Sequence, residues 1–184
     1  GDLGQTELAR ERLALEEFIR FQRQIRERRK TFQAKVKALE CSGDDRLVQP
    51  FLAGLGYEFN GDPQRAWDEI PRDMAGSYPM RRLLQGDVGS GKTAVAACAG
   101  LRAIESGFSV VVLAPTEILA EQHYRVFGKW LEPLGIPVHL HTGARKTMSD
   151  PGQAELSIGN SELPPLVIGT HALVEEKFAL ENIG

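Results

Sequence analysis

The sequence contains no apolar run approaching the roughly 20 residues that cross a membrane, and no basic leader follows Gly1. It has only two cysteines, Cys41 and Cys98, without metal-ligand spacing between them, so free thiols are expected. Its formal net charge of −3 supplies no global basic field, so nucleic acid could be contacted only through a local patch or main-chain amides. These features predict a cytoplasmic, monomeric protein with no membrane partner.

The composition is that of a globular protein, with 42% hydrophobic and 26% charged residues among 184. This length suits one domain with an appendage. Because the chain opens on Gly1 and stops at Gly184 directly after an apolar segment, we expect it to be part of a longer protein.

A long helix is predicted from Thr6 to about Glu40, where apolar residues recur among many charged ones without proline or glycine. Its second half is strongly basic, with Glu27 as the single acid. The basic residues are Arg20, Arg23, Arg26, Arg28, Arg29, Lys30, Lys35 and Lys37. A solvated helical face is the simpler interpretation, and a phosphate-contacting or domain-docking surface is the alternative.

The chain divides into a helical linker segment over residues 1–50 and an α/β domain over residues 51–184. Glycine and proline punctuate the junction. Beyond it, strands predicted at 82–85, 108–113, 136–140 and 166–168 alternate with helices at 93–105 and 117–131. Residues 143–165 are polar and allow a short helix over 153–158. This alternation predicts a parallel sheet, an α/β fold with crossover helices.

A phosphate-binding loop of the pattern G-x-x-x-x-G-K-[ST] lies between a predicted strand and a predicted helix. Its residues are Gly86, Asp87, Val88, Gly89, Ser90, Gly91, Lys92 and Thr93. Glycines allow successive N–H groups to converge on phosphate oxygens, and the helix N-terminus adds partial positive charge. Lys92 is expected to reach the β- and γ-phosphates of ATP, and the Thr93 hydroxyl to bind Mg²⁺. These two residues are the catalytic candidates.

Three segments together resemble the RecG family of superfamily 2 DNA helicases. Residues 82–93 resemble its motif I, residues 114–123 (A-P-T-E-I-L-A-E-Q-H) its motif Ia, and residues 169–173 (G-T-H-A-L) its next block. The resemblance covers roughly 51–184 and implies a RecA-like P-loop NTPase domain. It further implies an ATP-driven translocase on branched double-stranded DNA that acts at stalled forks and Holliday junctions in recombination and repair.

Further site residues follow from the resemblance and from their positions. Residues 59–64 resemble the family's adenine-recognition segment, which assigns Gln64 to the base edge and Phe59 to stacking. Thr116 follows a strand and precedes a helix, so it either contacts a DNA phosphate or caps the helix. Thr170, with Gly169 allowing close backbone approach, has the same two interpretations.

Two alternative functions remain open from the residues. A small-molecule kinase would use the same loop but would need a lid rich in arginine, whereas 143–165 offers only Arg145 and Lys146. A nucleotide-gated DNA-binding module without catalysis fits because no aspartate follows Asp150. The resemblance places the catalytic Asp-Glu pair and a second motor domain beyond Gly184. We therefore expect the chain alone to bind ATP weakly and to hydrolyse it negligibly.

His139 and His141 alternate along a predicted strand, yet no third ligand lies nearby in the sequence, so a structural role is expected. Trp67 and Trp130 lie among apolar helix positions and are expected in the core.

Overall fold

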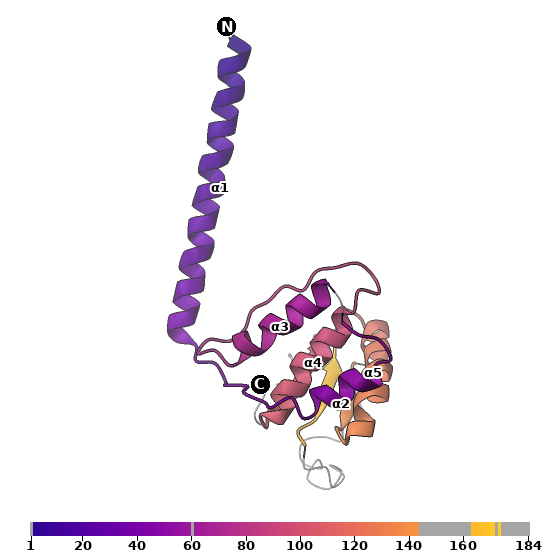
Figure 1. The fold of residues 1–184 in the computed structure, drawn as a ribbon. Helices are drawn as coiled ribbons and strands as arrows, with labels where there is room; N and C mark the ends of the chain where they lie inside the picture. Colours follow the sequence, from indigo (N-terminus) through magenta and orange to yellow (C-terminus); the bar gives the residue numbers. More distant parts are fainter. Residues whose placement is uncertain (1, 60, 144–162, 172, 174–184) are drawn as a thin grey trace.

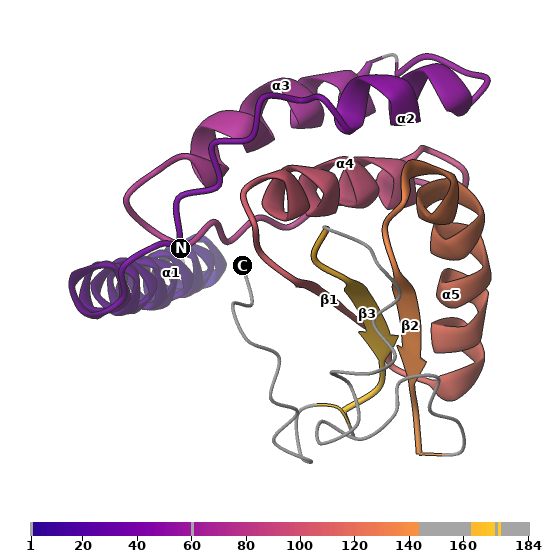
Figure 2. The same cartoon turned by 90° about the horizontal axis from the view of Figure 1, so that it is seen from below.

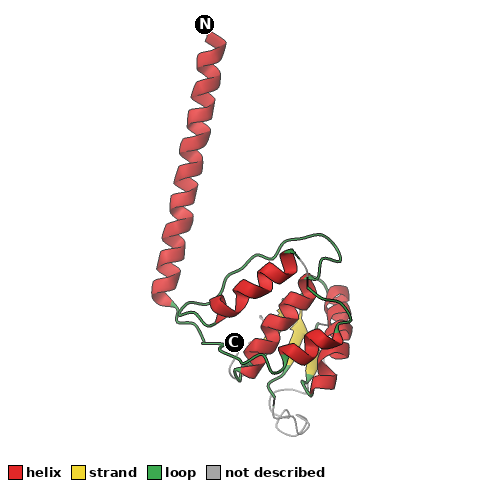
Figure 3. Ribbon diagram, in the orientation of Figure 1, coloured by secondary structure: helices red, strands yellow, loops and turns green. Residues whose placement is uncertain are grey.

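A computed structural model describes residues 2–59, 61–143, 163–171 and 173 of the chain. The long helix α1 (Asp2–Lys35) projects away from a layered α/β body (Figure 1). The body contains α2 (Val48–Gly54), α3 (Asp62–Met74), α4 (Lys92–Glu105) and α5 (Glu117–Leu131), coloured red in Figure 3. The 3-10 turn η1 (Glu132–Leu134) follows α5.

The described strands form a parallel sheet in the order β1-β3-β2, with β1 at Val110–Leu113, β2 at Val138–His141 and β3 at Leu166–Gly169. Val110 and Val138 both pair with Leu166 across the ladders. All four residues of β3 are buried, as expected for a central strand of a parallel sheet. The crossover through α5 leaves a place between β1 and β2, and β3 fills it. The predicted α/β fold with a parallel sheet is confirmed.

Helices cover the sheet in layers (Figure 2). The helix α4 lies between the sheet and an outer layer formed by α2 and α3, while α5 packs along β2 and β3. Small and apolar side chains of α4, including Ala97, Cys98 and Leu101, are fully buried in the core. Trp67 is buried in the core as predicted, whereas Trp130 is partly buried and packs edge-on against the core residue Phe127.

The N-terminal helix is present but shorter than predicted, because it ends at Lys35 rather than near Glu40. Beyond Val36, whose N–H still donates to the Phe32 carbonyl at 3.1 Å, main-chain N–H groups of the next residues hydrogen-bond to the body. The Ala38 N–H donates to the Ser77 carbonyl at 3.3 Å, and the Cys41 N–H donates to the Met74 carbonyl at 3.2 Å. These tertiary hydrogen bonds replace the helical ones, and helix propensity alone could not reveal them.

The strand predicted over residues 82–85 is wrong for the described part of the chain. The segment has no regular secondary structure, and none of the three described strands pairs with it. Leu83 is 88% exposed, so this segment lacks both the ladder hydrogen bonds and the two-sided burial that stabilise a central strand. The helix suggested at 153–158 lies outside the described residues.

Candidate nucleotide-binding site

The glycine-rich loop turns directly into the N-terminus of α4. Gly89 and Gly91 have φ angles of 82° and 84°, in the left-handed region that glycine adopts without steric cost. Gly91 is the N-cap of α4 and supplies no side-chain cap. The first-turn N–H groups of a helix have no intrahelical acceptor, so this end presents donors and partial positive charge at the loop.

The Lys92 ammonium group lies inside the loop. It donates to the Gly86 carbonyl at 2.8 Å, to the Asp87 carbonyl, and to the Ser90 hydroxyl at 3.3 Å. These acceptors are neutral, and the side chain makes no ion pair within the described residues. A phosphate oxygen offers a charged acceptor at the same place, where a charge-assisted hydrogen bond is roughly twice as strong as a neutral one.

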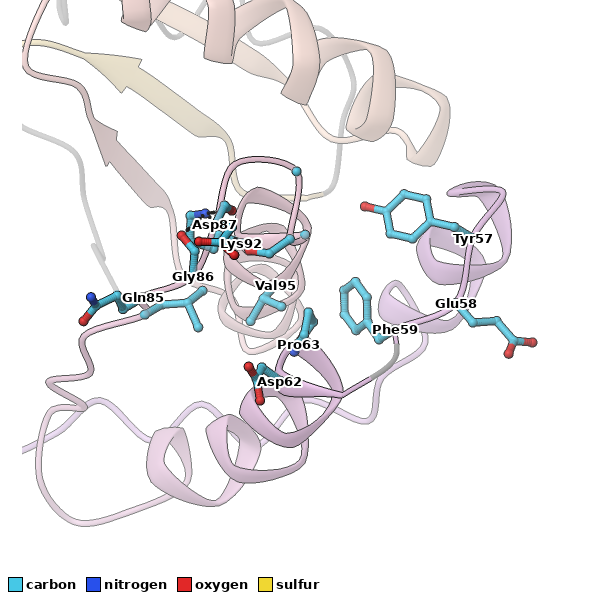
Figure 4. A pocket seen from close by; sticks show the side chains of 14 residues that line it. Tyr57, Glu58, Phe59, Asp62, Pro63, Gln85, Gly86, Asp87, Lys92 and Val95 are labelled. Atoms are coloured by element: carbon cyan, nitrogen blue, oxygen red, sulfur yellow. Dashed lines mark hydrogen bonds between the residues drawn. The ribbon is translucent and has the colours of Figure 1, made fainter.

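A cavity of about 470 Å³ opens between the loop and the segment that precedes α3. This volume lies within the usual range for a small-molecule site. Figure 4 shows Lys92, Gly86 and Asp87 on one side and the Phe59 ring and Pro63 on the other. The cavity therefore combines polar donors with an apolar wall, and the residues present fit a nucleotide whose phosphates lie on the loop.

The loop approaches the apolar wall closely at one glycine. A Cβ added to Gly91 would lie 3.7 Å from Pro63 Cγ and 4.0 Å from a ring carbon of Phe59. Phe59 itself is only 8% exposed, so its ring is fixed by packing. Tyr57 lies beside it, with ring centroids 6.4 Å apart, and also lines the cavity.

The two predicted adenine-recognition residues occupy different positions. Phe59 lines the cavity, whereas Gln64 is absent from its described lining. The Gln64 side-chain amide donates to Asp68 at 2.7 Å, one turn further along α3. The geometry thus brings Phe59 and the loop together and leaves Gln64 engaged on its own helix.

Thr93 is absent from the described lining of the cavity that Phe59 lines. It lines an adjoining cavity of about 330 Å³ together with Tyr57, Ser90 and Trp130. Its side chain is half-buried in the first turn of α4. The role of Thr93 as an Mg²⁺ ligand stays a prediction.

Thr116 and Thr170 follow β1 and β3, so parallel pairing places both at the same edge of the sheet. The Thr116 hydroxyl accepts a hydrogen bond from the Leu119 N–H at 3.3 Å and therefore caps α5. The side chain remains exposed, so capping leaves it accessible to solvent. Thr170 follows Gly169, where an added Cβ would collide with the His141 carbonyl and the Leu173 side chain.

The loop belongs to this same edge of the sheet. A short turn joins the end of α4 to β1, and the two elements pack together, so they run in opposite directions. The N-terminus of α4 therefore lies toward the carboxyl end of β1, where open parallel sheets bind ligands.

Two other expectations concern histidines and cysteines. Burial lowers the pKa of His139, and no group of three metal-ligating side chains occurs among the described residues. Both cysteines are buried free thiols, as predicted. No helix in the described ranges is long and apolar enough to span a membrane.

A polar cluster at the other end of α4 was missed by sequence reasoning. Arg102 and Glu105 bind the segment that follows α1, through Asp45 and main-chain groups of residues 41–47. Its only sequence signal is charged residues in an otherwise Ala-rich helix, which does not identify a partner about sixty positions away.

Comparison with known proteins gives consistent matches. A family model described as DEAD/DEAH box helicase matches residues 64–183. The ATP-dependent DNA helicase RecG of Escherichia coli is 43% identical over 175 residues, covering 95% of this chain and 25% of that protein. The RecG protein of Synechocystis sp. is 38% identical over 178 residues, covering 96% of this chain and 21% of that protein.

A solved structure of RecG bound to a three-way DNA junction is also similar. It has a TM-score of 0.70 and 36% sequence identity, covering 88% of this chain and 21% of that chain. The chain thus spans about a quarter or less of the length of the curated relatives it matches.

Proposed function

The chain belongs to the DEAD/DEAH box helicase family, and from this we propose that it supplies the ATP-binding part of a DNA motor of the RecG type. The observation that carries the proposal is the exposed glycine loop at the N-terminus of α4, facing a cavity with an apolar wall. The proposed activity is ATP-dependent translocation on branched double-stranded DNA, in recombination and repair.

The loop residues hold the triphosphate in this proposal. Main-chain donors near Gly89 and Gly91 receive phosphate oxygens, and Lys92 exchanges its contacts with loop carbonyls for the β- and γ-phosphates. Phe59 packs against the base, while Thr93 holds Mg²⁺. Bound Mg²⁺ would neutralise phosphate charge, and the free energy of hydrolysis would supply the motor.

Thr116 and Thr170 are proposed DNA contacts. Both lie at the carboxyl edge of the sheet, on neighbouring strands β1 and β3. Hydroxyl groups and helix N-termini commonly hold backbone phosphates, which fix position without reading sequence. The similarity to RecG bound to a three-way junction supports branched DNA as the partner. We further propose a monomer that works in the cytoplasm, and sedimentation measurements with and without DNA test the monomer.

The alternative functions gain no support from a specific observation. A kinase lid would have to come from residues 144–162, which lie outside the described chain. The matched family is one of helicases rather than kinases. A nucleotide-gated DNA-binding module shares the same loop and would be separated by DNA-stimulated ATP turnover in a longer protein that also supplies the catalytic Asp-Glu pair.

Titration calorimetry with Mg²⁺ and ATP tests the proposal, using the wild-type chain and Lys92→Ala. The Lys129→Ala variant removes an exposed lysine from α5 and serves as the matched control. Binding that survives in Lys129→Ala and disappears in Lys92→Ala supports the site. Equal ATP affinity in all three proteins would refute it.

A further inference from the structure

A further cavity lies between the C-terminal half of α1 and the segment before the glycine loop. Its volume is about 350 Å³. It is separate from the nucleotide cavity and shares no lining residue with it. The residues that line it are Ile25, Arg28, Arg29, Phe32, Pro79 and Arg81.

Among the described residues, the lining carries three guanidinium groups and no carboxylate. None of Arg28, Arg29 and Arg81 forms an ion pair with any residue that the structure describes. The next residue in sequence behaves differently, since Arg82 binds Glu69 and Asp73, both at 2.5 Å. Arg82 is thus neutralised by acids, whereas its neighbour Arg81 keeps its charge at the cavity.

The guanidinium of Arg81 is held in place by stacking. It lies 3.8 Å from the centre of the Phe32 ring, which is a close cation–π contact. A guanidinium stacked in this way keeps its N–H edge available, and its planar fork matches the oxygens of a phosphate. Ile25 and Pro79 add apolar surface to the same lining.

The α1 residues that line the cavity lie on one face of the helix. Ile25, Arg28, Arg29 and Phe32 recur at helical spacing and so lie on the same side. Arg23, Arg26 and Lys30 occupy the opposite side of the same helix. The chain as a whole carries a net charge of −3, so the positive charge at the cavity is local.

We propose that this cavity binds the phosphate backbone of double-stranded DNA, as a contact additional to the sheet edge. The inference deepens the proposed function, because it assigns a second DNA-binding surface to the same motor. Phosphates match three unpaired guanidinium groups without requiring carboxylates from a partner. The sequence left the basic helix either as a solvated face or as a phosphate-contacting or domain-docking surface, and the unpaired arginines favour phosphate contact over both other interpretations.

Fluorescence anisotropy with a labelled DNA duplex over a range of salt concentrations tests this site on the full chain. The variant R28Q/R29Q/R81Q is compared with R23Q/R26Q/K30Q, which removes the same charge from the opposite face of α1. Three phosphate contacts predict that the slope of log affinity against log salt falls by about 2–3 in the first variant. The control variant should lose less than about one unit of slope.

A third variant isolates the stacking contact from charge. Phe32→Leu keeps every guanidinium but removes the ring under Arg81, so affinity for the duplex should fall about threefold without a change of slope. Circular dichroism confirms the fold of each variant. A Phe32→Leu protein with unaltered affinity would argue against an organised site.

Other outcomes would overturn the inference. Equal losses in the two triple variants would show only a non-specific charge effect, and tighter binding of poly-glutamate than of duplex would indicate a protein partner. ATP affinity is measured on the same samples. Intact ATP binding with equal DNA losses would reject this site alone, whereas absent ATP binding in the wild type would reject the proposed function and leave the DNA comparison valid.

Discussion

The two ends of helix α4 lie in contrasting environments. At the N-terminus, an exposed loop surrounds Lys92, whose ammonium group contacts neutral oxygens of that loop and, among the described residues, no carboxylate. At the C-terminus, Arg102 donates to the Asp45 carboxylate at 2.6 Å and to the Cys41 carbonyl at 3.3 Å. Glu105 accepts from the Asp45 N–H at 3.0 Å and from the Leu47 N–H at 2.5 Å.

The difference lies in what satisfies each charge. Arg102 has a side chain only 11% exposed and a carboxylate partner, so its charge is neutralised inside the protein. Lys92 has no such partner among the described residues and faces a cavity. One rigid helix therefore presents a ligand end and an anchor end, and the anchor end fixes the segment that leads from α1 into the body.

The largest change is expected in ATP affinity, from a substitution at the ligand end of α4 alone. Lys92→Ala removes the only lysine of the loop, so ATP affinity should fall at least about 100-fold, or about 2.7 kcal/mol. Stability in urea should change by less than about 0.5 kcal/mol, because the lost contacts are exposed hydrogen bonds within one loop. Calorimetry and chemical unfolding measure the two quantities. A large loss of stability would erase the contrast between the two ends.

The next largest change is expected in the free energy of unfolding, from a substitution at the anchor end alone. Arg102→Met keeps the apolar stem but leaves the partly buried Asp45 unpaired, at a cost of about 2 kcal/mol in the free energy of unfolding. The control is Arg46→Met, since Arg46 lies 3.9 Å from Asp44 in an exposed pair that contributes about 0–1 kcal/mol. Urea unfolding compares them. Similar losses for both arginines would mean that the anchor is no stronger than a surface pair.

Alanine substitutions at two glycines distinguish the cost of backbone strain from a loss of ATP binding. Gly91 and Gly107 lie at opposite ends of α4 with φ angles of 84° and 85°, so alanine at either position costs about 1 kcal/mol. Only Gly91 lies at the cavity, where a Cβ would approach Pro63. Gly91→Ala should therefore weaken ATP binding while Gly107→Ala does not, as calorimetry can show. Weakened binding in Gly107→Ala would contradict the separation.

An effect that is absent at neutral pH concerns the middle of the helix. Burial, with the Asp45 charge as a lesser cause, raises the pKa of the Cys98 thiol to about 12, compared with 9.0 for an exposed thiol. Because the folded state disfavours the thiolate, this contribution to stability is complete below pH 9.0 and is lost as pH rises toward about 12. Above pH 9 the free energy of unfolding should fall by at most about 1.4 kcal/mol per pH unit from this group.

Unfolding of the wild type and Cys98→Ala as a function of pH isolates that slope. The variant should lose the Cys98 component and keep that of Cys41, whose pKa is also raised by burial. Parallel pH profiles for the two proteins would show that the Cys98 thiol does not cause the pH dependence of the free energy of unfolding.

Local patterns made the ligand end predictable from the sequence. The loop pattern fixes glycine, lysine and threonine positions within eight residues, and α5 begins at Glu117 and ends at Leu131 as predicted. The similarity to RecG, inferred from three short segments, is confirmed by relatives and a solved structure at 36–43% identity. Each of these signals is carried by residues close together in the chain.

Non-local contacts limited the rest. The Asp45–Arg102 pair joins residues 57 positions apart, and the end of α1 depends on carbonyls of Met74 and Ser77. Gln64 contacts Asp68 rather than the cavity, because a side-chain hydrogen bond within α3 is available. Such choices among partners are made by tertiary packing, which single-sequence patterns do not encode.

Amide chemical shifts on addition of Mg²⁺ and ATP distinguish the ligand end of α4 from its anchor end. The largest shifts are expected on residues 86–93 and Phe59, while residues 41–47 and the last turn of α4 should change little. Unchanged shifts over residues 86–93, or the strongest changes at the anchor end, would contradict this assignment of the two ends.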